Sequence, residues 1–144
     1  MVALGLGLLS NAFEMVQAAT GGDSYVPLSP VRILDTRTDG STLGAGSSLS
    51  LQVAGVGEVP ATATAVAVNL TVTDTSRAGF LTAYPTGGAL PTTSNLNWSA
   101  GETVVNLAVV PVGSGGAVTF RNAIGSADLV WLPEENTYLW RPSA

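Results

Sequence analysis

The fold of this chain is decided by the stretch Ala65-Val66-Ala67-Val68-Asn69-Leu70-Thr71-Val72-Thr73. Large aliphatic residues occupy every second position from Val66 to Val72, and small or polar residues lie between them. Side chains in a β-strand point alternately to opposite faces of the sheet, so this pattern predicts a half-buried strand with its apolar face turned toward a core.

Similar stretches recur along most of the chain. Runs of β-branched residues are separated by clusters of Gly, Pro, Ser and Asp, which is typical of an all-β sandwich or barrel. A glycine-rich turn at 113–116 lies between two such runs and is a hairpin signal. We predict a single, jelly-roll-like β-sandwich with no helix beyond the N-terminal segment. The predicted strands are Val31–Thr36, Leu49–Val53, Ala65–Thr73, Phe80–Tyr84, Ser94–Trp98, Val104–Val110, Ala117–Asn122 and Ala127–Leu132.

The central pattern is repeated within the chain. The sequence Val68-Asn69-Leu70-Thr71-Val72 recurs 37 residues later as Val105-Asn106-Leu107-Ala108-Val109, and the same offset relates Gly79 to Gly116. The repeat indicates either two equivalent sites or duplicated hairpins whose Asn side chains bind neighbouring backbone groups. A weaker third match nearer the N-terminus leaves a β-trefoil or β-prism as the alternative fold.

The composition excludes several classes of function. The 144 residues are 46% hydrophobic and only 10% charged, with a net charge of −5, whereas nucleic-acid binding requires a basic face. Cys and His are absent, and all five cationic residues are Arg. The chain therefore lacks the commonest general base, a thiol and a lysine nucleophile. We expect no enzymatic activity and no cofactor.

The N-terminal segment, residues 1–22, has two interpretations. The apolar run Val2–Leu9 followed by the small residues near Val16-Gln17-Ala18 resembles a signal peptide, although the basic start of such a peptide is missing. Apolar residues also recur at spacings of four, three, four and three, which predicts a helix that packs against a partner in an assembly. The segment is too interrupted for us to expect a membrane anchor. The residues of this predicted interface are Val2, Leu6, Leu9, Phe13 and Val16.

A family resemblance covers about Tyr25 to Val130. The stretch Val26-Pro27-Leu28-Ser29-Pro30-Val31-Arg32-Ile33-Leu34-Asp35-Thr36-Arg37 resembles the V-P-L-x-P-x-R-x-L-D-T-R opening of a β-module common in actinobacterial secreted and surface proteins and in phage-encoded proteins. Later matches include Ser94-Asn95-Leu96-Asn97-Trp98 and Gly125-Ser126-Ala127-Asp128. The resemblance implies a non-catalytic β-domain. The chain departs from the family after Trp131, where the usual second Asp and Gly-Tyr pair are missing.

The strongest local motif contains Arg32, Asp35 and Arg37. On a strand, Asp35 and Arg37 would share one face, where they could grip an anionic or sugar ligand or form an ion pair that pins the strand. The spacing of Asp35, Asp39 and Gly40 does not match a calcium loop, so we predict no metal site.

The remaining carboxylates do not predict catalysis. Adjacent carboxylates on a strand face opposite ways, and the others lie in loops without an evident partner, so a paired-carboxylate hydrolase is not expected. The residues concerned are Glu134, Glu135, Asp74 and Glu102.

The aromatic residues near the C-terminus lie beyond the last predicted strand. We divide the chain into the N-terminal segment, a sandwich over 23–133 and an aromatic tail over 134–144. Trp98 is expected in the core, whereas Tyr138, Leu139 and Trp140 are expected to bind a neighbouring subunit or to fold back over their own sandwich.

These features predict a non-enzymatic structural subunit on the exterior of a larger assembly, such as a phage capsid decoration or fibre protein or a surface filament. Its partners would be copies of itself or other subunits of the particle, and its location would be extracellular, on a virion or cell surface. The alternative is a secreted module of an actinobacterial extracellular protein that binds carbohydrate, such as surface polysaccharide, or the cell wall.

Overall fold

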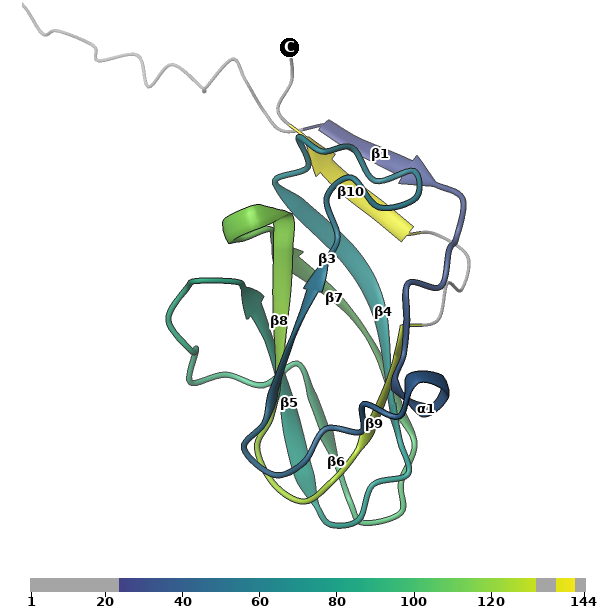
Figure 1. The fold of residues 1–144 in the computed structure, drawn as a ribbon, viewed down its shortest axis with the longest axis vertical. Coiled ribbons are helices and arrows are strands. Elements are labelled where there is room, and N and C mark those ends of the chain that lie inside the picture. Colours follow the sequence, from purple (N-terminus) through teal and green to yellow (C-terminus); the bar gives the residue numbers. More distant parts are fainter. Residues whose placement is uncertain (1–23, 132–136, 142–144) are drawn as a thin grey trace, which may run out of the picture.

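The computed structural model describes residues 24–131 and 137–141 as two antiparallel β-sheets that pack face to face (Figure 1). One sheet has six strands and the other has four. The elements are β1 (Ser24–Leu28), β2 (Leu34–Asp35), α1 (Thr36–Asp39), β3 (Ser48–Gln52), β4 (Ala65–Thr73), β5 (Gly79–Pro85), β6 (Leu96–Trp98), β7 (Val104–Pro111), a 3-10 turn (Ser114–Gly116), β8 (Ala117–Asn122), β9 (Asp128–Trp131) and β10 (Thr137–Arg141). The predicted all-β sandwich is therefore confirmed, and the β-trefoil or β-prism alternative is not the arrangement observed.

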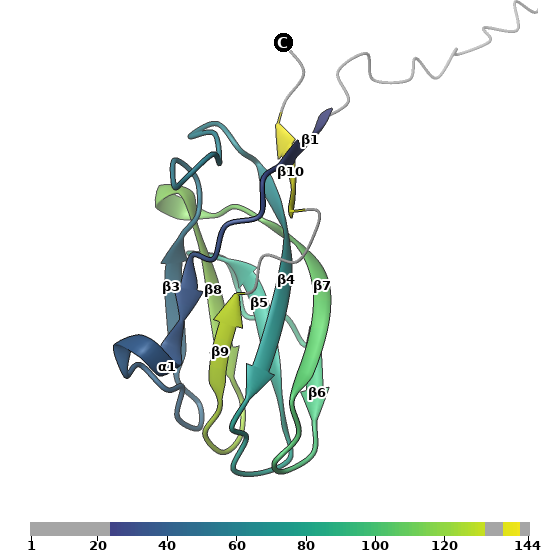
Figure 2. The ribbon, with the colours of Figure 1, turned by 90° about the vertical axis from the view of Figure 1, so that its right-hand side faces the viewer.

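Strand β4 is the centre of the six-stranded sheet, as Figure 2 shows. Along one side it pairs with β7, and along the other it pairs first with β10 and then with β9. The outer strands of that side are β1, beside β10, and β2, beside β9. The four-stranded sheet has the order β3-β8-β5-β6. This topology leaves β7 at a sheet edge, since within the described residues it pairs with β4 alone.

The core lies between the two sheets and follows the alternation seen in the sequence. The aliphatic positions of β4 are fully buried, as predicted, but Ala67 and Thr71 on its other face are buried too, so the strand is more than half covered. Trp98 is a core residue, as predicted, and its indole N–H donates to the carbonyl of Arg77. The largest fully buried side chains are Phe120, Leu70, Leu81, Leu96, Leu129, Val53, Val66, Val68, Val72 and Val110.

The two repeated units are not hairpins. Each unit places its first strand in the six-stranded sheet and its second strand in the four-stranded sheet, so that β4 pairs with β7 and β5 pairs with β8. The turn predicted at 113–116 is present, but it crosses between the sheets. It lies so close to the loop between β5 and β6 that a Cβ atom on Gly113 would stand 2.2 Å from the amide nitrogen of Thr86. The sequence of the turn predicted a hairpin because it reports local residues only, and it contains no sign of this contact with a distant loop.

The first predicted strand, Val31–Thr36, is mostly replaced by other structure. Only Leu34 and Asp35 form a strand, and α1 then makes a single helical turn that ends at Gly40, whose φ of 71° is left-handed. The Asp35 side chain accepts a hydrogen bond from the amide of Arg37 and so caps this turn. Asp is a favoured N-cap residue, and its local bond competes with strand pairing, which explains the difference.

Both ends of the described chain add strands that the sequence analysis missed. The C-terminal residues, predicted as a tail over 134–144 that binds a neighbour or folds back over its own sandwich, form β10 at Thr137–Arg141, between β1 and β4. Strand β1 contains Pro27 and forms a sheet edge, where a residue without an N–H group is tolerated. The apolar N-terminal segment, with its predicted helix and interface residues, lies outside the described residues.

Candidate functional site

The motif Arg-x-x-Asp-Thr-Arg forms one compact ion cluster around Asp35. The guanidinium of Arg37 donates to both carboxylate oxygens of Asp35, from Nε at 2.8 Å and from Nη2 at 2.7 Å. Arg32 Nη1 donates to the same carboxylate at 3.1 Å. The Asp35 side chain is only 6% exposed, whereas the Arg32 and Arg37 side chains are 47% and 46% exposed. The three candidate residues are thus brought together, with Arg37 placed by α1 and not by a strand.

The residue between the pair, Thr36, fastens this cluster to the six-stranded sheet. Its side chain is fully buried, its Oγ1 donates to Asp128 Oδ1 at 2.9 Å, and the same Oγ1 accepts the amide N–H of Leu129 at 2.9 Å. Thr38 Oγ1 donates in turn to the carbonyl of Asp35. The motif therefore joins the β2–α1 corner to β9, a segment far along the chain.

The charges around Arg37 favour a structural role over the binding of an anion. The hydrogen bond from the Arg37 side chain lowers the pKa of Asp35 to about 2, against a smaller opposing effect of desolvation. The pKa of Arg37 is raised, first by its hydrogen bond to Asp35 and further by the charges of Asp74 and Asp128. The Arg37 guanidinium is thus already paired with Asp35, and the charges of Asp74 and Asp128 further disfavour an added anion.

The lowered pKa of Asp35 predicts an acid-dependent stability. A carboxyl whose pKa is depressed in the folded state stabilises the fold above its unfolded value near 3.8, and this contribution is lost as the pH falls toward about 2. Asp35→Asn, which keeps the cap but removes the charge, is expected to lower the melting temperature by several degrees at pH 7. The difference from wild type should shrink between pH 4 and pH 2. Calorimetry of both proteins between pH 7 and pH 2 tests this prediction. A difference in melting temperature that stayed constant with pH would contradict it.

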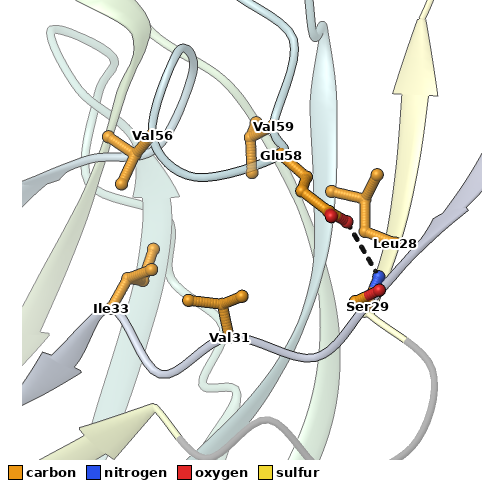
Figure 3. Close-up of a pocket in the computed structure, with 7 residues that line it drawn as sticks. All are labelled: Leu28, Ser29, Val31, Ile33, Val56, Glu58 and Val59. Carbon is orange, nitrogen blue, oxygen red and sulfur yellow. Dashed lines mark hydrogen bonds between the residues drawn. The ribbon is translucent and has the colours of Figure 1, made fainter.

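Residues that precede the cluster in the chain line a small apolar pocket (Figure 3). Val31 and Ile33 face Val56 and Val59 across it, and the Ser29 amide donates to Glu58 Oε2 at 3.2 Å. The cavity volume is about 20 Å³, which is close to the space of a single water molecule. This pocket lies where two loops pack against each other, and it is too small for a sugar or a cofactor.

An apolar row runs along the outer face of β7. Val105, Leu107 and Val109 are 51%, 55% and 58% exposed, whereas Ala108 and Val110, which point inward, are buried. The sequence predicted this strand but gave no sign that it would be an edge strand with its second face uncovered. We call Val105, Leu107 and Val109 the β7 row.

The register connects the β7 row to the C-terminal residues that were predicted as an interface. Ala67 of β4 pairs with Val109 on one side and with Tyr138 on the other, and Ala65 lies between Pro111 and Trp140. Leu139 pairs with Val66. The side chains of β10 lie outside the described structure, so the assembly role of Tyr138, Leu139 and Trp140 stays a prediction.

The remaining acidic residues have local structural roles where they are described. Asp39 accepts from the amide and hydroxyl of Ser41, and Glu102 Oε2 accepts from the Ser99 amide at 2.7 Å. Asp74 has a positive φ of 51° in a turn. Among the described residues, no three or more acidic side chains form a group that could hold a metal ion.

The other predicted carboxylates, Glu134 and Glu135, lie outside the described ranges. Within residues 24–131 and 137–141, no helix has both the length and the apolar character needed to cross a membrane. Comparisons with protein-family models and with curated proteins gave no match to the chain.

Proposed function

We propose that this protein is a non-enzymatic structural subunit that joins an extracellular assembly, on a virion or a cell surface, by pairing with copies of itself through β7. The observation that carries the proposal is the β7 row, in which aliphatic side chains are more than half exposed along an edge strand. Soluble proteins rarely leave such an edge open, because it is a template for pairing with another strand.

The sequence of β7 lacks the usual protection of an edge. Natural edge strands carry charges, bulges or prolines that prevent pairing. The strand reads VVNLAVVP, with no charged residue and with proline only at its last position, Pro111. The eight residues of β7 match nearly the whole length of β4, so they could support a new strand over the same length.

The residue pattern of β7 suits antiparallel pairing with a second copy. Pairing centred on Leu107 would place Leu107 against its symmetry mate and Val105 against Val109 of the other copy. Such aliphatic cross-strand pairs are favourable, and no like charges would meet. The two six-stranded sheets would then form one continuous sheet across a two-fold axis.

The energy of this contact favours an assembly of many copies over a tight isolated dimer. Covering the exposed half of each row residue contributes on the order of 1 kcal/mol, so six of them contribute about 6 kcal/mol. Association of two molecules costs a comparable amount of translational and rotational freedom. With the backbone hydrogen bonds of the new strand pair added, two free chains should associate weakly, with a dissociation constant of roughly 0.1–1 mM, and many copies held on one particle should associate firmly.

Placing a charge in the β7 row tests the proposal. Leu107→Asp would bring two carboxylates together at the two-fold axis, so the association measured by sedimentation up to about 1 mM should weaken by at least about 100-fold. Ile124→Asp is the matched control, because Ile124 is a similarly exposed aliphatic residue outside β7, at 48%. Both variants should keep the melting temperature of the wild type.

A cysteine crosslink locates the contact directly. The natural chain has no Cys, so Leu107→Cys introduces the only thiol. Directly opposed residues in antiparallel strands have Cα atoms about 4.5–5.5 Å apart, within the range of a disulfide. Mild oxidation should link Leu107→Cys into dimers and leave Ile124→Cys monomeric. A wild-type protein that stays monomeric throughout, together with no crosslink at position 107, would show that self-association through β7 is wrong.

A further inference from the structure

A second exposed region lies on the outer face of the four-stranded sheet, away from β7. A hollow with a volume of about 240 Å³ is lined by β5, by β8 and by the loop that joins β5 to β6. Figure 1 shows this loop projecting from the sheet. We call the region the Phe80–Arg121 hollow. Its lining residues are Phe80, Thr82, Leu90, Pro91, Thr92, Arg121 and Ala123.

The positive charge of the hollow is not neutralised by the described residues. Arg121 lies on β8 directly opposite Thr82 of β5, and its Nη1 donates to the carbonyl of Gly46 at 2.7 Å. In the described part of the chain, both Arg32 and Arg37 have a carboxylate within 4 Å, whereas Arg121 has none. A guanidinium has five N–H donors in a planar fork that matches a carboxylate. A half-buried Arg that uses one of them on a carbonyl keeps donors for a ligand.

The aromatic ring of Phe80 lines the same hollow as the Arg121 guanidinium. Phe80 is 39% exposed and Leu90 is 49% exposed, so the hollow has an accessible apolar surface. An aromatic ring is a flat apolar surface against which the C–H groups of a sugar ring can pack, while a neighbouring polar group binds a substituent of the sugar. The hollow thus combines an apolar wall with one cation.

The wall of the hollow is held in place before any ligand arrives. Thr82 Oγ1 donates to the carbonyl of Thr93 at 3.0 Å, and the amide of Ala83 donates to Asn95 Oδ1 at 2.6 Å. The Asn95 amide also donates to the carbonyl of Leu81. The loop is therefore fastened to β5 beside the lining residues Leu90 and Thr92, which lowers the entropy lost on binding.

We propose that the Phe80–Arg121 hollow binds one acidic sugar unit, a six-membered ring that carries a carboxylate. The carboxylate would accept from the free guanidinium N–H groups of Arg121, and the ring would lie against Phe80 and Leu90. The volume is below the roughly 300–1,000 Å³ of sites for drug-sized ligands, which suits a single ring. A polyanion such as nucleic acid is disfavoured by the net charge of −5.

The inference extends beyond the proposed assembly and is tested independently of it, on a Leu107→Asp background that is expected to be monomeric. The probes are glucuronate, glucose and inorganic phosphate, and binding is followed by amide chemical shifts of Thr82, Thr92 and Arg121. Glucuronate should bind in the millimolar range and more weakly at high salt. Glucose should bind at least about tenfold more weakly, because it lacks the charge-assisted bonds.

Two substitutions identify the residues responsible. Arg121→Gln should weaken glucuronate binding by at least about tenfold and remove its advantage over glucose, whereas Phe80→Ala should weaken both sugars. Arg77→Gln is the control, since Arg77 is an exposed arginine that does not line the hollow. Phosphate binding equal to that of glucuronate would show a simple anion site and overturn the proposal, as would shifts unchanged by glucuronate. The same spectra report whether each variant is folded.

Discussion

Replacing Thr36 by valine is expected to lower the free energy of unfolding by about 2–3 kcal/mol, although the two side chains have nearly the same shape. The Thr36 hydroxyl is fully buried and makes two bonds, to the Asp128 carboxylate and from the Leu129 amide. Valine would leave the buried Leu129 N–H without a partner, and the cost of such an unsatisfied donor exceeds the net value of the bond itself.

A second threonine provides the matched control. Thr71 is 6% exposed on β4, and within the described structure its hydroxyl is buried without a hydrogen-bond partner. Thr71→Val should therefore be neutral or stabilising, because it removes a buried polar atom that gains nothing from the fold. Urea unfolding followed by tryptophan fluorescence compares the two variants. Equal losses of stability would mean that the Thr36 bonds are not what joins α1 to β9.

Replacing Asn122 by alanine is expected to cost about 2–3 kcal/mol of unfolding free energy, because removal of its Oδ1, which is buried without a partner in the described structure, offsets part of the loss of its donor bonds. Its side chain is fully buried on β8, and Nδ2 donates to the carbonyls of Leu43, Gly44 and Gly125. Alanine would leave buried carbonyl groups unpaired and open a cavity between two loops.

The control for this variant is an asparagine on the same sheet. Asn97 of β6 is exposed, and its side chain accepts only from the Ser94 hydroxyl among the bonds described for it. Asn97→Ala should change the free energy of unfolding by less than about 0.5 kcal/mol.

The loop that Asn122 holds continues to Gly46, whose carbonyl accepts a hydrogen bond from Arg121. We therefore expect Asn122→Ala to weaken glucuronate binding as well as the fold, and stability close to that of wild type would contradict the role given to Asn122.

The local pattern was sufficient to predict most strands. The positions of β4, β7 and β8 could be predicted from the chain alone, because their apolar residues follow the two-residue period of a strand. The buried aliphatic face was predictable only for β4, since the matching face of β7 is exposed and both faces of β8 are buried. The ion pair of Asp35 and Arg37 was also predictable, since the two residues are close in sequence. The helical turn at α1 was not predicted, because the strand-like pattern before it hid the capping bond of Asp35.

The candidate surfaces, in contrast, were decided by contacts between segments far apart in the chain. Nothing in the sequence of β7 says that, among the described residues, it pairs with β4 and with no other strand, and this pairing makes Val105, Leu107 and Val109 an exposed row. The return of β10 between β1 and β4 depends likewise on an open edge of β4.

The same division holds for the hollow and for the join between α1 and β9. Phe80 and Arg121 line one hollow because β5 pairs with β8, and Thr36 bonds to Asp128 across the sheet corner. The sequence by itself determined the strands from β3 to β9 and which of their faces are apolar, because these follow from the chemistry of neighbouring residues, whereas β1 and β10 could not be read from it. The tertiary structure alone decided which strands became edges and which side chains became neighbours, because strand pairing depends on the stability of the whole sandwich.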